Sequence, residues 1–154
     1  MNWIGPIFKN AGGWEAFVAY DQGTWYLKSD NPVKIGEGRS GMSLLPILQE
    51  GYGEDYQTQI KLLKSGLTQK GQDQDKAYDF PFIVPVLFAY QVMPNWAEFA
   101  VKWLPHVVKK QEDALAIFDS CYKQPHSQKV RHKTLSFINR WSNENGYQFI
   151  RPGH

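Results

Sequence analysis

Short apolar segments separated by polar and glycine-containing residues occupy the first part of the chain, a pattern typical of β-strands. Aromatic and branched residues are concentrated at residues 14–20 and 24–28, and residues 21–23 between them form a short loop that contains a glycine. This pattern predicts a β-hairpin. A third extended segment is predicted at residues 33–35. Two strands alone are marginal in water, so the hairpin is expected to pack on helices or to gain a strand, for which residues 146–151 are a candidate.

Further along the chain the apolar residues recur at helical spacing. Tyr56 and Ile60 share one face of a helix predicted over residues 54–65, which Gly66 is expected to end. Residues 68–79 are polar and without a period, which predicts an exposed loop. Four further helices are predicted, at residues 85–93, 96–107, 112–122 and 127–145.

Strands first and helices afterwards predict an α+β fold. We expect a single domain over residues 1–154, in which a small N-terminal antiparallel sheet packs on a C-terminal bundle of about four to five helices. Its β-rich part covers residues 1–36 and its helical part residues 42–145. A chain of 154 residues buries roughly 70% of its unfolded surface, so this core needs no disulfide or metal.

The composition indicates the cellular compartment of the protein and shows a surplus of aromatic side chains. The 42% of hydrophobic residues argue against disorder, and the 15% of aromatic residues leave some for a recognition surface. The one cysteine, Cys121, excludes an intrachain disulfide and suits a reducing compartment. The first residues lack the basic and apolar regions of a secretion signal, and the apolar stretch at residues 80–93 is too short to span a bilayer. We therefore expect a cytoplasmic protein that does not enter a membrane.

The charge of the chain is unevenly distributed. From Lys123 onward there are six Lys and Arg residues against one acid, a balance of +5, so the +2 of the whole chain leaves −3 for the rest. One predicted helix carries most of this charge, at Lys129, Arg131, Lys133 and Arg140. Such a basic face is ordinary on a solvated helix, and it also suits an acidic protein or the phosphates of a nucleic acid. No helix-turn-helix, RRM or KH signature accompanies it.

The segment KIGEGRSGMS contains a G-x-G-x-x-G motif at Gly36, Gly38 and Gly41. A dinucleotide-binding loop requires a second strand that ends in an acidic residue about twenty residues further on, whereas Asp55 at that distance begins a helix. The motif also resembles the glycine-rich loop of protein kinases, but the kinase V-x-x-A-x-K, H-R-D and D-F-G motifs are missing. A glycine-rich connecting turn is therefore favoured, with nucleotide binding as an alternative.

Metal-binding and catalytic motifs are weak. Cys121, His126 and His132 have the spacing C-x4-H-x5-H, which lacks a paired cysteine, and Cys121 lies on an apolar helix face. Neither G-x-S-x-G nor H-E-x-x-H occurs. We assign no metal ligand, no cofactor and no catalytic residue.

These observations together predict a non-enzymatic protein–protein interaction module, such as an adaptor, accessory or assembly factor. The partner is expected to present an acidic surface or an extended peptide that adds a strand to the open edge of the sheet. The predicted site joins exposed hairpin aromatics to the glycine loop, at Trp25, Tyr26, Lys34, Arg39 and Met42. Nucleic-acid binding through the basic helix is an alternative, and a nucleotide-binding enzyme that uses the loop at residues 36–41 is a less favoured one. The sequence does not fix the oligomeric state.

Overall fold

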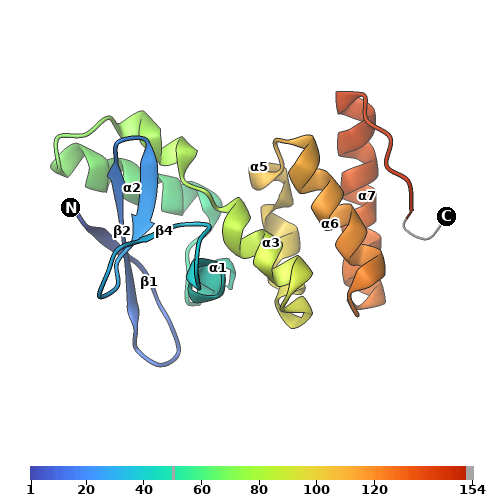
Figure 1. The fold of residues 1–154 in the computed structure, drawn as a ribbon, viewed down its shortest axis with the longest axis horizontal. Helices are drawn as coiled ribbons and strands as arrows, with labels where there is room; N and C mark the ends of the chain where they lie inside the picture. The colour runs from blue at the N-terminus through green and yellow to red at the C-terminus, as the bar shows by residue number, and fades with distance from the viewer. Residues whose placement is uncertain (50, 152–154) are drawn as a thin grey trace. The chain divides into compact units, whose positions relative to one another are not determined.

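The computed structural model describes residues 1–49 and 51–151 and confirms the α+β class, with the sheet first and helices after it (Figure 1). By its internal contacts the chain divides into two compact units, Met1–Pro85 and Val86–His154. That both units fold as one domain stays a prediction.

The sheet of the N-terminal unit has four antiparallel strands in the order of the sequence. They are β1 (Ile4–Lys9), β2 (Glu15–Asp21), β3 (Thr24–Leu27) and β4 (Val33–Lys34). The predicted hairpin is confirmed as β2 and β3, and the third extended segment as β4. Strand β1 was not predicted, because Gly5-Pro6 interrupts its apolar pattern. As an edge strand, β1 tolerates a proline that offers no N–H to a sheet.

Helix α2 (Tyr56–Gln69) covers one face of this sheet (Figure 1). Asp55 begins it by accepting a hydrogen bond from the Thr58 N–H at 2.8 Å. The predicted end at Gly66 is wrong, because the helix runs on for three residues. Gly66 serves packing here: a Cβ at this position would overlap the side chain of Ile4 in β1.

Residues 68–79 are mostly exposed, as predicted, but they are not an irregular loop. The end of α2 takes the first two, and a 3₁₀ helix, η2 (Gln74–Asp79), takes the last six. Ala77 in this helix is buried, and the Gln72 side-chain amide donates to the Tyr20 carbonyl at 2.8 Å. Polar side chains hid this packing from the sequence pattern, because the contacts that hold the segment are hydrogen bonds to backbone carbonyls.

The C-terminal unit is helical. α3 (Ile83–Gln91) leads the chain into it, and α6 (Gln111–Lys123) and α7 (Gln128–Asn145) lie within about two residues of their predicted bounds. The helix predicted over residues 96–107 is a run of short turns: η3 (Pro94–Trp96), α4 (Ala97–Ala100), η4 (Val101–Trp103) and α5 (Leu104–Val107). Pro105 lies inside this run and offers no N–H to the carbonyl one turn before it, which interrupts α-helical hydrogen bonding there.

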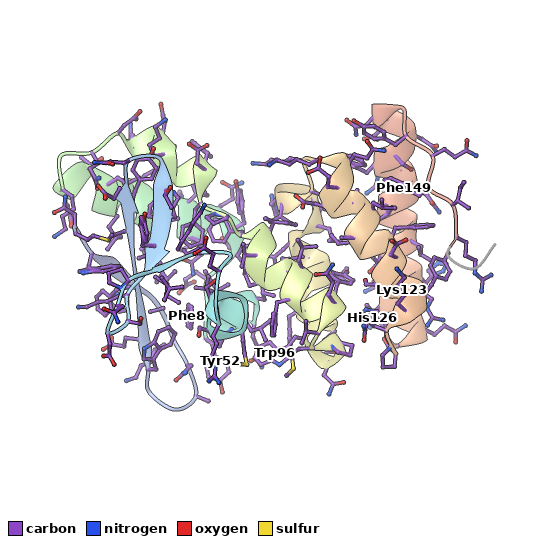
Figure 2. The ribbon with its side chains drawn as sticks, in the orientation of Figure 1. Phe8, Tyr52, Trp96, Lys123, His126 and Phe149 are labelled. Carbon is purple, nitrogen blue, oxygen red and sulfur yellow. The ribbon has the colours of Figure 1, made fainter. Side chains whose placement is uncertain are left out.

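The chain after α7 packs within its own unit and is not a strand. Tyr147 stacks on Trp141 of α7 with 5.5 Å between ring centroids, and Phe149 (labelled in Figure 2) lies 5.5 Å from Phe118 of α6. Residues 147–151 belong to no strand or helix, so the candidate strand at residues 146–151 does not form. Of the helices in the described part of the chain, none combines the length and apolarity needed to cross a membrane.

Candidate interaction surfaces

Trp25 and Tyr26 are neighbours in β3 but lie on opposite faces of the sheet. Trp25 is only 4% exposed and packs between Tyr20 and Phe80, at 5.5 and 5.2 Å between ring centroids. Its indole N–H donates to the Lys76 carbonyl at 3.2 Å. The expectation that Trp25 is exposed is therefore wrong, because η2 covers it. Tyr26 is half-buried on the other face.

The face that carries Tyr26 also carries two more aromatic rings. Phe17 lies on this face because strand positions alternate. Ile4 pairs with Val18 on the helix-covered face, so the preceding residue, Trp3, is on the same face as Tyr26. The Lys28 ammonium lies 5.2 Å from the Phe17 ring centroid and 6.0 Å from that of Trp3. These distances place both rings beside one cation.

Lys34 completes this surface. It pairs directly with Tyr26 across β3 and β4, so the two side chains leave the sheet side by side. The aromatic sheet face thus comprises Trp3, Phe17, Tyr26, Lys28 and Lys34. The three rings are half-buried and both lysines are exposed. Of the predicted partner site, the structure brings Tyr26 and Lys34 together on one face, whereas Arg39 and Met42 lie beyond the sheet, exposed in the glycine loop and in α1 (Ser40–Leu44).

The side chain of Ser40 holds the glycine loop closed. Gly36 and Gly38 have φ angles of 111° and 55°, which only glycine adopts readily, and Gly41 lies inside α1. The Gly36 N–H donates to the Ser40 hydroxyl at 2.9 Å, and that hydroxyl donates to the Glu37 carbonyl at 2.7 Å. The amide that a bound phosphate would use at Gly36 already has a partner, which supports the interpretation as a turn.

The basic helix predicted near the C-terminus is α7, and its four basic residues do not form one surface. Lys129 and Lys133 line a groove of about 310 Å³ together with Lys102 of η4. The apolar walls of this groove are Phe99, Val101 and Val130. We call these six residues the lysine groove. Arg140 instead lies 5.8 Å from the Phe137 ring.

Arg131 points away from the groove into a buried polar cluster. Its Nε is buried and has no hydrogen-bond partner among the described atoms, and its positive charge acts on both Cys121 and His126. His126 (Figure 2) is 6% exposed, and its Nε2 lies 2.9 Å from the Tyr90 carbonyl oxygen. The Tyr90 hydroxyl in turn shares a hydrogen bond of 2.7 Å with Thr134. This cluster joins the N-terminal half of α7 to α3.

Burial governs the chemistry of the cluster. It raises the pKa of the Cys121 thiol to about 11, against smaller lowering effects of Arg131 and Ser120, so this thiol is protonated at neutral pH. Burial lowers the pKa of His126, which keeps its ring neutral. Within residues 1–49 and 51–151 no three His, Cys, Asp or Glu side chains gather as a metal site would require.

Several residues of these surfaces were missed at the sequence level. Phe17 and Lys28 could have been found, because strand alternation puts them on the same face as Tyr26. Lys102 and Phe99 could not, since they reach α7 only through tertiary packing. Comparison of the chain with protein-family models, curated proteins and solved structures finds no match.

Proposed function

We propose that this protein is a non-enzymatic, cytoplasmic protein-interaction module whose partner binds the aromatic sheet face. The observation that carries the proposal is the grouping of three half-buried aromatic rings with two lysines on one side of a four-stranded sheet. Aromatic anchors that are partly exposed and held in place by a rigid scaffold are typical of the centres of protein interfaces.

The sheet restricts the motion of these anchors. Tyr26 is fixed in register between Ala19 of β2 and Lys34 of β4. The Lys28 ammonium lies 5.2 Å from the Phe17 ring centroid, and the ring itself is half-buried. Because side chains that are ordered before binding lose little entropy on association, this face favours a specific partner.

The remaining features of the chain support binding rather than catalysis. The protonated thiol of Cys121 is a poor nucleophile, and burial keeps it from substrates. The Ser40 bonds in the glycine loop disfavour a nucleotide there. We therefore expect ATP, GTP and NAD to leave the melting temperature unchanged, and a clear rise with any of them would contradict the proposal.

The experiment compares two double variants in a pull-down from the native cell, read by mass spectrometry. Tyr26→Ala/Lys34→Ala removes an aromatic residue and a lysine from the sheet face. Lys64→Ala/Tyr78→Ala removes the same residue types from another cation–aromatic pair of the same unit, in which the ammonium lies 4.4 Å from the ring centroid.

We expect the wild type and the Lys64/Tyr78 variant to retain the same proteins, and the Tyr26/Lys34 variant to lose at least one of them. Circular dichroism and thermal melting of both variants check that the unit is still folded. Retention of every protein by a folded Tyr26/Lys34 variant would refute a role of this face.

Nucleic-acid binding is the second candidate, and the gathering of Lys102, Lys129 and Lys133 around one groove favours it. It predicts retention on a DNA or heparin column at low salt and an affinity that falls steeply as salt rises. Passage through both columns without retention would dispose of it.

A further inference from the structure

We propose that the lysine groove of the C-terminal unit is a second binding site, which takes an acidic peptide segment with an apolar anchor residue. The groove lies between the α4–η4 turns and the first two turns of α7. It shares no residue with the aromatic sheet face, so this site stands or falls independently of the partner proposed for that face.

Charge selects the kind of partner. Three lysines line the groove against one acid, Glu98. Lys129 and Lys133 are one turn apart on α7, so both ammonium groups lie along the same wall, and both side chains are exposed. Lysine rims of this kind attract carboxylates and disfavour basic partners.

The apolar walls select an anchor residue. Val101 and Val130 face the groove, and Phe99 is held in place by Trp96 (Figure 2), with an edge contact of 5.7 Å between ring centroids. A volume of about 310 Å³ is at the lower end of ligand pockets, so it suits one or two side chains. An apolar side chain flanked by carboxylates satisfies the walls and the rim together.

A single-stranded nucleic acid fits this groove less well. Such ligands are held by successive aromatic platforms along a basic track, whereas the groove has a single ring, at Phe99, and two valines that offer nothing to a phosphate. The basic track also ends at the groove, because Arg140 lies against Phe137 and Arg131 is half-buried.

Another groove of the same unit lacks this selectivity. It measures about 490 Å³ and lies along α6, where Leu115 is 39% exposed. Its lysine, Lys123 (Figure 2), is paired with Asp119 at 3.7 Å, and Glu112 leaves the lining slightly acidic. An acidic peptide should therefore prefer the lysine groove.

The test measures fluorescence anisotropy of a labelled peptide in which Asp and Glu flank a central Leu and Phe, with the full chain as titrant. Two further probes are the same peptide with Asn and Gln in place of the acids, and an oligothymidylate of equal length. We expect saturable binding of the acidic peptide, weaker binding of both other probes, and an affinity that falls with salt. Tighter binding of the oligothymidylate would overturn the proposal, as would a lack of saturable binding of the acidic peptide.

Two double variants locate the binding. Lys129→Glu/Lys133→Glu reverses the rim, and it should fold because both residues are exposed and Lys129 lies in the first turn of α7, where an acidic residue is favourable. Lys109→Glu/Lys110→Glu makes the same change of net charge at exposed residues of the same unit that do not line the groove. We expect the first variant to weaken binding at least about tenfold and the second by less than about threefold.

Equal loss in both variants would show attraction to net charge alone and would overturn the assignment of the site. Circular dichroism confirms that each variant is folded. The sheet-face variant Tyr26→Ala/Lys34→Ala should bind the acidic peptide as the wild type does, so the failure of either proposal is visible apart from the other.

Discussion

The aromatic sheet face and the lysine groove use similar residue types in different ways. On the sheet face the Lys28 ammonium lies near two aromatic rings and interacts with them. Ring surface therefore contributes more than charge to what a partner would contact there. In the groove Lys129 and Lys133 are exposed around apolar walls, so charge dominates. Similar residue types are thus arranged with the rings prominent on one surface and the charges on the other, and we expect the first to select a partner by shape and the second by charge. Binding at the groove should therefore depend on salt more steeply than binding at the sheet face.

The largest effect separates the two faces of the sheet. Trp25→Ala removes a buried ring and should lower the free energy of unfolding of the N-terminal unit by about 3–5 kcal/mol. Tyr26→Ala, one position along, should cost about 1 kcal/mol or less, since its ring is half-buried on the outer face. Urea unfolding followed by circular dichroism measures both. Equal costs would break the distinction between a structural face and a recognition face.

The next largest effect on stability concerns the close packing of α2 against β1. Gly66→Ala should destabilise the unit by about 1–3 kcal/mol, because its Cβ would overlap Ile4, although alanine favours helix formation by about 1 kcal/mol. Ser65→Ala, at the exposed neighbouring position, should be neutral or slightly stabilising. A stabilising Gly66→Ala in thermal melting would show that α2 does not approach β1 this closely.

A smaller effect on stability tests the buried polar cluster between α7 and α3. Tyr90→Phe removes the buried hydroxyl that is hydrogen-bonded to Thr134 and should cost about 1–2 kcal/mol. Tyr147→Phe removes a hydroxyl from an exposed ring and should leave stability within about 0.5 kcal/mol of the wild type. Chemical denaturation of both variants decides whether this hydrogen bond anchors α7 to α3.

The smallest effect is a pH dependence of the C-terminal unit. Burial lowers the pKa of His126 in the folded chain. As the pH falls through about 6.5, this histidine is therefore protonated in the unfolded chain while it stays neutral in the folded chain. Stability is therefore complete above that pH and is lost as the pH falls, by at most about 1.4 kcal/mol per pH unit.

Denaturation at about pH 7.5 and about pH 5.5 measures this loss. His126→Gln should reduce this loss. A loss that survives in the His126 variant would assign it to another group.

Much of the fold follows from local patterns, and the exceptions have physical causes. Runs of aromatic and branched residues around a glycine-containing turn predict β2 and β3, and helical spacing predicts α6 and α7. Strand β1 could not be predicted from the sequence, because Gly5-Pro6 interrupts its apolar pattern. Gly66 carries the usual stop signal of a helix, yet its lack of a side chain serves contact with Ile4, a residue far away in the sequence.

The candidate sites show the same limit. Alternation alone puts Trp25 and Tyr26 on opposite faces, but which face is covered depends on η2, whose polar sequence gives no sign that it packs. Lys129 and Lys133 are visible as a basic pair in the sequence, whereas the groove requires Lys102 and Phe99, which only the tertiary structure brings to α7.

The most direct measurement places a photo-crosslinking group on the sheet face itself, as Tyr26→benzoylphenylalanine, and compares it in living cells with Tyr78→benzoylphenylalanine, an exposed tyrosine in the same unit. We expect a discrete crosslinked protein from position 26 and none from position 78. Failure of position 26 to crosslink any protein, or the same adducts from both positions, would contradict the proposed function.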